Sequence, residues 1–397
     1  MARTAKRIQQ SEIQGLKYFS MLDELLKKLK HVGTQRDKAG NRELFCDQYL
    51  SLLLLYFFSP VITSMRALQE ASELEKVQKV LGVKRVSLGS FCEAPTVFDS
   101  EPVHDIIREL AQRAVPLVSG KEAEALKNLT AVDGSVFQSV TKASWALWLD
   151  PQHRAAKLHL HYSVFEGVPR QAKITPAACS EPAHLKAMLE PGRLYVMDRG
   201  YHDYSLFRAV IDAKSSFIAR VKNNIAYVVK EERAVTTEAR QAGVIRDVIL
   251  SRLGTSHHKD EVQQALRLVV VATTNDEGEP IELWLVTDCL ELAAEHVAVG
   301  YRYRWTIELF FRWFKRILGC RHLISTKENG VTMQLYAALI ASLLIVLWTG
   351  LKANKRTWEM VQFFFMGWAT EAELERHIQR QKEQQKKRQS RAATTKR

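Results

Sequence analysis

The stretch Leu194-Tyr195-Val196-Met197-Asp198-Arg199-Gly200 decides the fold, because four apolar residues run directly into an aspartate and a glycine-containing turn. Leu129-Thr-Ala-Val-Asp133-Gly134 has the same pattern, which is that of a short buried strand ending at an acid. Between the two, residues 156–164 alternate apolar and polar side chains, as a strand with one buried face does. The sequence therefore predicts a sheet with helices around it.

The chain before these strands has helical apolar spacing over residues 11–116, with 43–58 as a strongly apolar helix. We expect an all-α N-terminal domain there. Within it, helical spacing over 65–80 followed by Ser87 as the N-cap of a helix through residue 93 is a weak helix-turn-helix pattern, and ordinary helix packing explains it at least as well.

The chain after these strands is first rich in strands and then helical. A long helix is expected over 294–318 and an apolar helix over 333–351. The end of the chain beyond residue 376 is rich in Gln, Lys and Arg and is expected to be helical or disordered. The expected strands are 217–222, 225–230, 244–250, 266–273 and 281–287.

Composition excludes several classes of protein. Hydrophobic residues make up 46% and charged residues 25%, which excludes a wholly disordered chain. The formal charge of +13 suggests a polyanionic partner, but residues 376–397 contribute +8 of it, so a solvated basic tail remains an alternative. The apolar runs 50–58 and 335–348 fall short of the roughly 20 residues that span a bilayer, so we expect no membrane insertion and read the second run as a buried helix.

Cysteines and histidines give no metal or disulfide pattern. His159 and His161 lie on one strand face and His257-His258 form a loop pair, without a nearby acid or cysteine to complete a ligand set. A zinc site or disulfide framework is not indicated, because the cysteines are scattered, odd in number and never in a C-x-x-C pair; they are Cys46, Cys92, Cys179, Cys289 and Cys320.

The late helix carries the third acid. On an ideal helix Tyr301, Arg304, Glu308 and Lys315 lie within about 60° of one another, while the apolar residues face the other way. For Glu308 taken alone, a surface ladder of ion pairs is the better explanation, because such pairs at i and i+4 are commonplace. Two aspartates at strand ends favour chemistry instead, since phosphoryl transfer with two metal ions needs several carboxylates that converge.

The string Tyr301-Arg-Tyr-Arg304-Trp-Thr-Ile-Glu308-Leu-Phe-Phe-Arg-Trp-Phe-Lys315 matches Y-x2-R-x3-E-x6-K. It resembles the signature of bacterial insertion-sequence transposases often called the IS-four family, and the segments around Asp133 and Asp198 resemble the two aspartate motifs of that family. The resemblance covers roughly residues 129–351.

The resemblance implies an α/β fold, with a ribonuclease H-like catalytic core interrupted by a β-rich insertion and preceded by an all-α N-terminal domain. Asp133, Asp198 and Glu308 would be the catalytic acids and the metal ligands. Two Mg²⁺ ions are the implied cofactor, with Mn²⁺ as a substitute. The expected divisions are a DNA-binding domain (1–116), the first part of the core (117–222), the insertion (223–290), the second part of the core (291–355) and a basic tail (356–397).

The same resemblance implies the DNA contacts. Arg304 and Lys315 match the basic positions of the motif and would contact phosphates, while Tyr301 would line the same face. The segment around Trp284 resembles the strand that, in hairpin-forming relatives, supplies a tryptophan to stack on a flipped base. A core tryptophan is the alternative at this position.

The leading hypothesis is a cut-and-paste DNA transposase that acts on the terminal inverted repeats of its element and on target DNA, as a homodimer on DNA in the bacterial cytoplasm near the nucleoid. A catalytically silent DNA-binding repressor and a nuclease acting on free DNA are the alternatives. Acids at all three motif positions favour the enzyme over the repressor, and strand transfer would separate it from the nuclease.

Overall fold

The computed structural model describes residues 22–33, 41–138, 143–150, 153–255, 262, 264–275, 277–316, 318–319 and 323–394. The chain divides into two compact units. A helical unit comprises Met1–Ala114, Gln138–Ala146 and Arg312–Arg397, and a sheet unit comprises Val115–Phe137 and Leu147–Phe311. The predicted His257-His258 pair and Cys320 lie outside the described residues.

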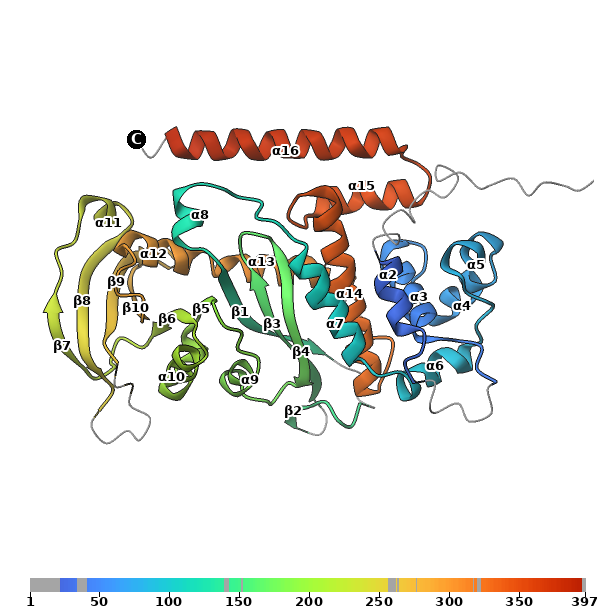
Figure 1. The fold of residues 1–397 in the computed structure, drawn as a ribbon, viewed down its shortest axis with the longest axis horizontal. Helices are drawn as coiled ribbons and strands as arrows, with labels where there is room; N and C mark the ends of the chain where they lie inside the picture. The colour runs from blue at the N-terminus through green and yellow to red at the C-terminus, as the bar shows by residue number, and fades with distance from the viewer. Residues whose placement is uncertain are drawn as a thin grey trace, which may run out of the picture. The chain divides into compact units, whose positions relative to one another are not determined.

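The helical unit begins with short helices, and Ser87 caps the start of one of them as predicted. Ser87 accepts a hydrogen bond from the backbone amide of Ser90, and Ser64 does the same for Ala67. The predicted helix over 65–80 is two helices, because the chain turns between Ser72 and Glu75. The helices of this unit are α2 (Asp23–Leu29), α3 (Cys46–Phe58), α4 (Met65–Ser72), α5 (Glu75–Leu81), α6 (Leu88–Val97), α7 (Glu101–Gln112), α14 (Glu328–Thr349), α15 (Lys355–Phe365) and α16 (Glu371–Thr394) (Figure 1).

Helix α14 is the core of the helical unit. Among the described residues it alone is long and apolar enough to cross a membrane by length and composition, and 94% of its most apolar stretch is buried inside the protein. It starts five residues before the predicted position 333, because Asn329 fixes its first turn by donating hydrogen bonds to the carbonyls of Pro95 and Phe98. This burial is that of a core helix, as predicted for the run 335–348.

The sheet unit contains one large mixed sheet, so the fold is α/β (Figure 1). The strand order is β2-β3-β1-β5-β6-β10-β9-β8-β7, and β4 pairs with β3. The strands are β1 (Leu129–Gln138), β2 (Leu147–Asp150), β3 (His153–Ser163), β4 (Val168–Pro176), β5 (Leu194–Met197), β6 (Ser216–Val221), β7 (Tyr227–Glu232), β8 (Val244–Leu253), β9 (Leu266–Thr274) and β10 (Pro280–Thr287). The helices of this unit are α8 (Lys121–Ala125), α9 (Glu181–Ala187), η3 (Arg199–Tyr201), α10 (Tyr204–Asp212), α11 (Thr237–Gln241) and α12 (Ala294–Arg302).

Two kinds of pairing make up the sheet. Strands β3 and β4 form an antiparallel pair, whereas β5 runs parallel to both β1 and β6. The later strands β7 to β10 are antiparallel to one another, and β10 joins them to β6 with Trp284 opposite Val221. The strand-rich segment therefore extends the same sheet.

One face of the sheet is covered by α9 and α10 over an apolar cluster. The rings of Phe207 on α10 and Phe217 on β6 stack with their centroids 4.6 Å apart. Val132 at the middle of β1 and Met197 at the end of β5 belong to the same cluster. Because side chains alternate along a strand, the residues that follow Val132 and Met197 belong to the opposite face.

The predicted continuous helix over 294–318 is wrong in one respect, since the chain forms two helices, α12 and α13 (Trp305–Arg316). The amide of Arg304 bonds to the carbonyl of Tyr301 and that of Thr306 to Tyr303, both with the tighter i to i+3 spacing. The hydroxyl of Thr306 also donates to the Tyr303 carbonyl at 2.7 Å. These bonds end α12 without a proline or glycine.

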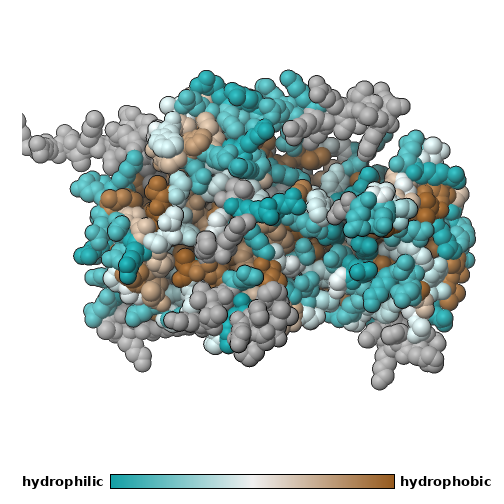
Figure 2. All heavy atoms as spheres, turned by 180° about the vertical axis from the view of Figure 1, so that it is seen from behind, coloured by the Kyte–Doolittle hydropathy of each residue, from teal (hydrophilic) through white to brown (hydrophobic). Residues whose placement is uncertain are grey.

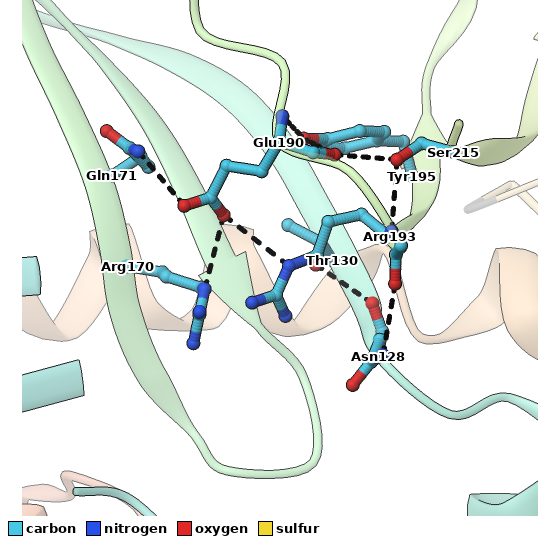
Figure 3. A network of polar contacts seen from close by, with 9 residues as sticks. Asn128, Thr130, Arg170, Gln171, Glu190, Arg193, Tyr195 and Ser215 are labelled. Atoms are coloured by element: carbon cyan, nitrogen blue, oxygen red, sulfur yellow. Dashed lines mark hydrogen bonds and ion pairs between the residues drawn. The ribbon is translucent and has the colours of Figure 1, made fainter. Parts of the chain in front are cut away.

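A polar network ties together the end of the sheet where β1 and β5 begin (Figure 3). The carboxylate of Glu190 accepts hydrogen bonds from Arg170 at 3.2 Å and from Gln171 at 3.0 Å, and it forms an ion pair with Arg193 at 3.4 Å. The Glu190 carbonyl accepts a 2.6 Å bond from Ser215. Burial alone would raise the pKa of the Glu190 carboxyl, but Gln171, Arg170 and Arg193 together lower it.

Candidate active site

The sheet brings Asp133 and Asp198 together. Strands β1 and β5 are parallel, and Ala131 on β1 pairs with Val196 on β5. The same register continued by two residues places Asp133 beside Asp198, with the two strands on the order of 5 Å apart. The Asp198 carboxylate also raises the pKa of Asp133, which is consistent with neighbouring aspartates; their catalytic role stays a prediction.

Burial makes a negative charge costly at Asp133. Burial first, and then the carboxylates of Asp198 and Glu181, raise the pKa of the Asp133 carboxyl to about 7, against the opposing effects of the Gly134 amide and the Arg304 guanidinium. The Gly134 amide donates to Asp133 Oδ1 at 2.8 Å. The carboxylates of Asp133, Asp198 and Glu181 repel one another where burial limits their hydration. A bound cation would offset this repulsion.

Asp198 is fixed by the turn that follows β5. Its backbone is extended, and its Oδ1 accepts a hydrogen bond from the Gly200 amide at 2.8 Å, so the side chain caps the short helix η3. A Cβ on Gly200 would lie 3.1 Å from Asp198 Oδ1, which is a tight contact. The glycine of the Asp198-Arg199-Gly200 motif therefore lets the carboxylate fold back onto its own turn.

Glu308 reaches the same region from α13. Helix α12 packs closely on the face of the sheet opposite the apolar cluster, since a Cβ on Gly300 would lie 2.8 Å from Ile218 Cδ1. Two residues after α12 ends, Arg304 forms an ion pair with Glu308 at 2.6 Å, and their side chains are 16% and 29% exposed. The break between the two helices thus places Arg304 and Glu308 on the side of the sheet that carries Asp133 and Asp198.

Arg304 joins the acids electrostatically. Burial lowers the pKa of Arg304, but Tyr301, Glu308 and Asp198 together raise it above its usual value. The guanidinium lies 5.8 Å from the centre of the Tyr301 ring, and Arg304 Nε is buried without a hydrogen-bond partner among the described residues. Arg304 therefore lies among negative groups of the site.

The donor set suits a hard divalent cation, because carboxylate oxygens are its preferred ligands. Asp133 and Asp198 lie side by side, while Glu308 is turned onto Arg304. Within the described part of the chain, no three His, Cys, Asp or Glu side chains converge closely enough to hold one ion. Asp133 and Asp198 thus fit a metal as a pair, and Glu308 would have to turn from Arg304 to join them.

The other predicted residues lie in different surroundings. Tyr301 is buried and contacts the Arg304 guanidinium with its ring, so its side chain is a support for Arg304 rather than an open surface. Lys315 is half-buried near the end of α13, in the helical unit.

Trp284 is half-buried on β10 and packs against the apolar cluster. Its ring meets Tyr227 edge-on with centroids 5.8 Å apart, and its indole nitrogen donates to Glu282 at 3.0 Å. The pairing with Val221 puts it near the end of β6. These contacts favour a packing role, and the base contact stays a prediction.

Glu181 and Lys157 were missed by the sequence analysis. Glu181 opens α9 and forms an ion pair with Lys157 at 3.1 Å. A Cβ on Gly134 would lie 2.6 Å from Glu181 Oε1, so the carboxylate occupies the space that a side chain at Gly134 would need. The Ser180-Glu181-Pro182 helix start is readable in the sequence, but its contact with the residue after Asp133 exists only in the fold.

His159 and His161 are both buried on β3. His159 Nε2 bonds to the Thr175 hydroxyl at 2.9 Å, and its ring lies 4.6 Å from that of His184. Burial, together with the positive charge of His184 and Lys157, lowers the pKa of His159 to about 3. These contacts explain His159 by packing and hydrogen bonding, and the ring of His161 meets the Tyr195 ring edge-on with centroids 5.5 Å apart.

Comparison with known proteins identifies a protein family that matches this chain. A family model described as a transposase DDE domain matches residues 124–344, which is more than half of the chain. The chain is 28% identical over 211 residues to a Sinorhizobium fredii protein named as transposase y4zB, covering 53% of this chain and 57% of that protein. It is 24% identical over 249 residues to a Geobacillus stearothermophilus protein named as a transposase for insertion sequence element IS5377, covering 62% and 64%.

A third relative is a Synechocystis protein named as a transposase for insertion sequence element IS4SA, 31% identical over 153 residues, covering 38% of this chain and 40% of that protein. The matches thus span less than two thirds of each relative. Among solved structures, a synaptic complex of piggyBac transposase with hairpin DNA is similar with a TM-score of 0.45 and 9% identity, covering 92% of this chain and 82% of that one.

Proposed function

The chain belongs to the family of transposases with a DDE domain, and from this premise we propose that it is a DNA transposase that cuts and rejoins phosphodiester bonds. The observation that supports the proposal is the parallel register of β1 and β5, which, continued by two residues, would set Asp133 beside Asp198. Its substrates would be the terminal inverted repeats of its element and a target duplex.

Asp133, Asp198 and Glu308 would hold the divalent metal, two Mg²⁺ ions with Mn²⁺ as a substitute. Bound metal would supply Lewis acidity toward the attacking and leaving oxygens of the scissile phosphate. The protein's own part is positioning. The β-strand register holds the two aspartates together, Gly134 and Gly200 admit close contacts, and Arg304 orients Glu308 while its positive charge reduces the repulsion among the acids.

We further propose a ribonuclease H-like core. Its support is the order β4-β3-β1-β5-β6, an antiparallel group followed by two strands parallel to β1. Strands β7 to β10 would be the insertion (223–290), after which residues 291–355 return the chain to the core with Glu308. Residues 1–116 would bind DNA and 356–397 would form a basic terminal region. The enzyme would act as a homodimer on DNA in the bacterial cytoplasm, close to the nucleoid.

The proposal is tested with purified protein, labelled duplex carrying the element's terminal repeat, and MgCl₂. We expect strand cleavage at the repeat end and joining of the released 3′-end to a second duplex, both lost in chelator. Binding without cleavage would indicate a silent repressor instead. Cleavage without joining would indicate a nuclease.

A further inference from the structure

Residues at the start of α15 and in the middle of α16 line a cleft within the helical unit. Helix α16 runs alongside α15 (Figure 1). Its volume is about 440 Å³. The wall near α15 carries the cations Lys352, Lys355 and Arg356. The wall on α16 carries the carboxamides of Gln381, Gln384 and Gln385. None of the residues that line it is an acid.

The cleft is held in shape by the way α16 packs. Leu374 and Ile378 are buried on one side of this helix. Further along, the ammonium of Lys382 lies 3.2 Å from the position of a Cβ on Gly350, directly beside the end of α14. Gly350 is left-handed and closes α14, where the last carbonyls concentrate negative charge. Lys382 thus lies against the end of α14, and Gln381, Gln384 and Gln385 near it line the cleft.

The surroundings of the cleft are positive. Lys355 pairs with Glu359 at 3.5 Å with both side chains exposed, so this pairing neutralises little of its charge. Burial and then the charges of Arg380 and Arg356 lower the pKa of His377. Lys386 and Lys387 continue along α16 and are exposed. The outer surface of α16, at the top of Figure 2, is mostly hydrophilic.

We propose that this cleft binds the sugar-phosphate backbone of duplex DNA. The proposal rests on the proposed function and names a surface for it. Lysine and arginine neutralise phosphates, and glutamine carboxamides donate hydrogen bonds to phosphate oxygens without adding the negative charge of glutamate. Leu351 is the apolar residue among those that line the cleft, and none of them is an aromatic residue on which a base could stack, so we expect contacts to the backbone that do not depend on base sequence.

The test compares two triple variants in chelator, where binding needs no metal. K352A/K355A/R356A removes the cationic wall, and K127A/K214A/K230A removes three exposed lysines of the sheet unit as a matched control. Affinity for terminal-repeat duplex and for an unrelated duplex is measured at several salt concentrations. We expect the first variant to weaken binding to both duplexes alike and to flatten the plot of log affinity against log salt by about 0.9 per lost phosphate contact, so about 2–3 in all.

Q384E is the second variant, since Gln384 is exposed and its replacement disturbs no packing. It places a carboxylate in the cleft, and we expect it to weaken binding to both duplexes in the same way. A salt slope no flatter than that of the control triple variant would overturn the proposal, as would a loss confined to the terminal-repeat duplex. The binding measurements do not require catalysis. A wild-type protein that fails to cleave DNA would therefore contradict the proposed function, whereas the salt dependence of binding would still test the cleft.

Discussion

Arg304 and Glu308 form an ion pair of 2.6 Å at the point where α12 ends and α13 begins. Glu308 is therefore not an isolated carboxylate on a helix face. Its orientation depends on a cation that also interacts with Asp198 and lies over the Tyr301 ring. Because this pair sits in a helix break, the position of Glu308 relative to the two aspartates depends on the short turn between the helices.

Replacing Arg304 should therefore reduce catalysis more than folding. Partners that orient a metal-binding side chain typically contribute about 10- to 100-fold in activity, so we expect Arg304→Gln to slow cleavage by that factor. Arg304→Lys should recover only part of it, because an ammonium lacks the planar fork of the guanidinium. Single-turnover cleavage rates test this, with Arg302→Ala on the exposed neighbouring position as control. Full activity in Arg304→Gln would contradict the positioning role.

Replacing the acids should remove cleavage and spare DNA binding. Asp133→Asn, Asp198→Asn and Glu308→Gln keep the shape of each side chain and remove the charge that a metal ion needs. In chelator, the thermal midpoint of Asp133→Asn should not fall, because burial and the neighbouring carboxylates disfavour the charge that it removes. Cleavage and gel-shift assays, with thermal melts, check these outcomes. Normal cleavage by Glu308→Gln would remove it from the site.

Gly134→Ala tests the contact of Glu181 with the site. The added Cβ would lie 2.6 Å from Glu181 Oε1, so the Glu181 side chain has to move and its 3.1 Å ion pair with Lys157 is disturbed. We expect slower cleavage with a loss of stability of about 1 kcal/mol or less, since the obstacle is the end of a flexible side chain. In a double-mutant cycle, Gly134→Ala should cost little once Glu181→Ala is present. Strictly additive losses would argue against this contact.

Glu190→Gln should make stability depend less on pH. The folded-state pKa of Glu190 is lowered, so its charge stabilises the protein fully above the ordinary carboxyl pKa of about 4.3, and this contribution is lost as pH falls through the folded pKa. We expect a loss of about 1–3 kcal/mol at neutral pH, as for hydrogen bonds to a charged group, and almost none near the acid limit. Urea unfolding at several pH values measures it, with exposed Glu124→Gln as control. A constant difference at all pH values would contradict the charge as its source.

Trp284→Ala separates packing from base stacking. The half-buried indole contacts Tyr227 and the apolar cluster, so we expect a stability loss of about 2–3 kcal/mol, below that of a fully buried ring, with all activities falling together. Thermal melts are compared with the yields of nicked and hairpin DNA. An unchanged midpoint with accumulating nicks would instead support a flipped base stacked on Trp284.

The strands could be located from sequence because the pattern that defines them is local. Apolar runs ending at Asp133 and Asp198 mark the positions at which β1 carries its acid and β5 ends, and the predicted strands after residue 217 differ from the observed ones by a few residues. The helix break before Trp305 could not be located, because it depends on hydrogen bonds within one turn rather than on a proline or glycine. The apolar periodicity of residues 294–318 continues through it.

The site was predictable only where chain order and strand pairing coincide. Asp198 follows β5, as its motif predicts, whereas Asp133 lies within β1, which continues to Gln138 instead of ending at the acid. The two strands pair in parallel, so the similar motifs suggest that the two acids meet. Glu181 reaches Gly134 from a helix on the other face of the sheet, and Arg304 takes Glu308 as its partner. Such contacts join segments with unrelated local patterns, and no spacing rule connects them.

The pairing of β10 with β6 also limits how this protein can be shortened. Excising residues 223–287 would remove the neighbour that covers the outer edge of β6, and the apolar strand Ser216–Val221 would then present unpaired backbone groups to other molecules. Such a minimal enzyme would be prone to self-association even though all three acids remain in the chain. The strand-rich segment is thus part of the central sheet, and a shortened protein that lacks it would need another strand to pair with β6.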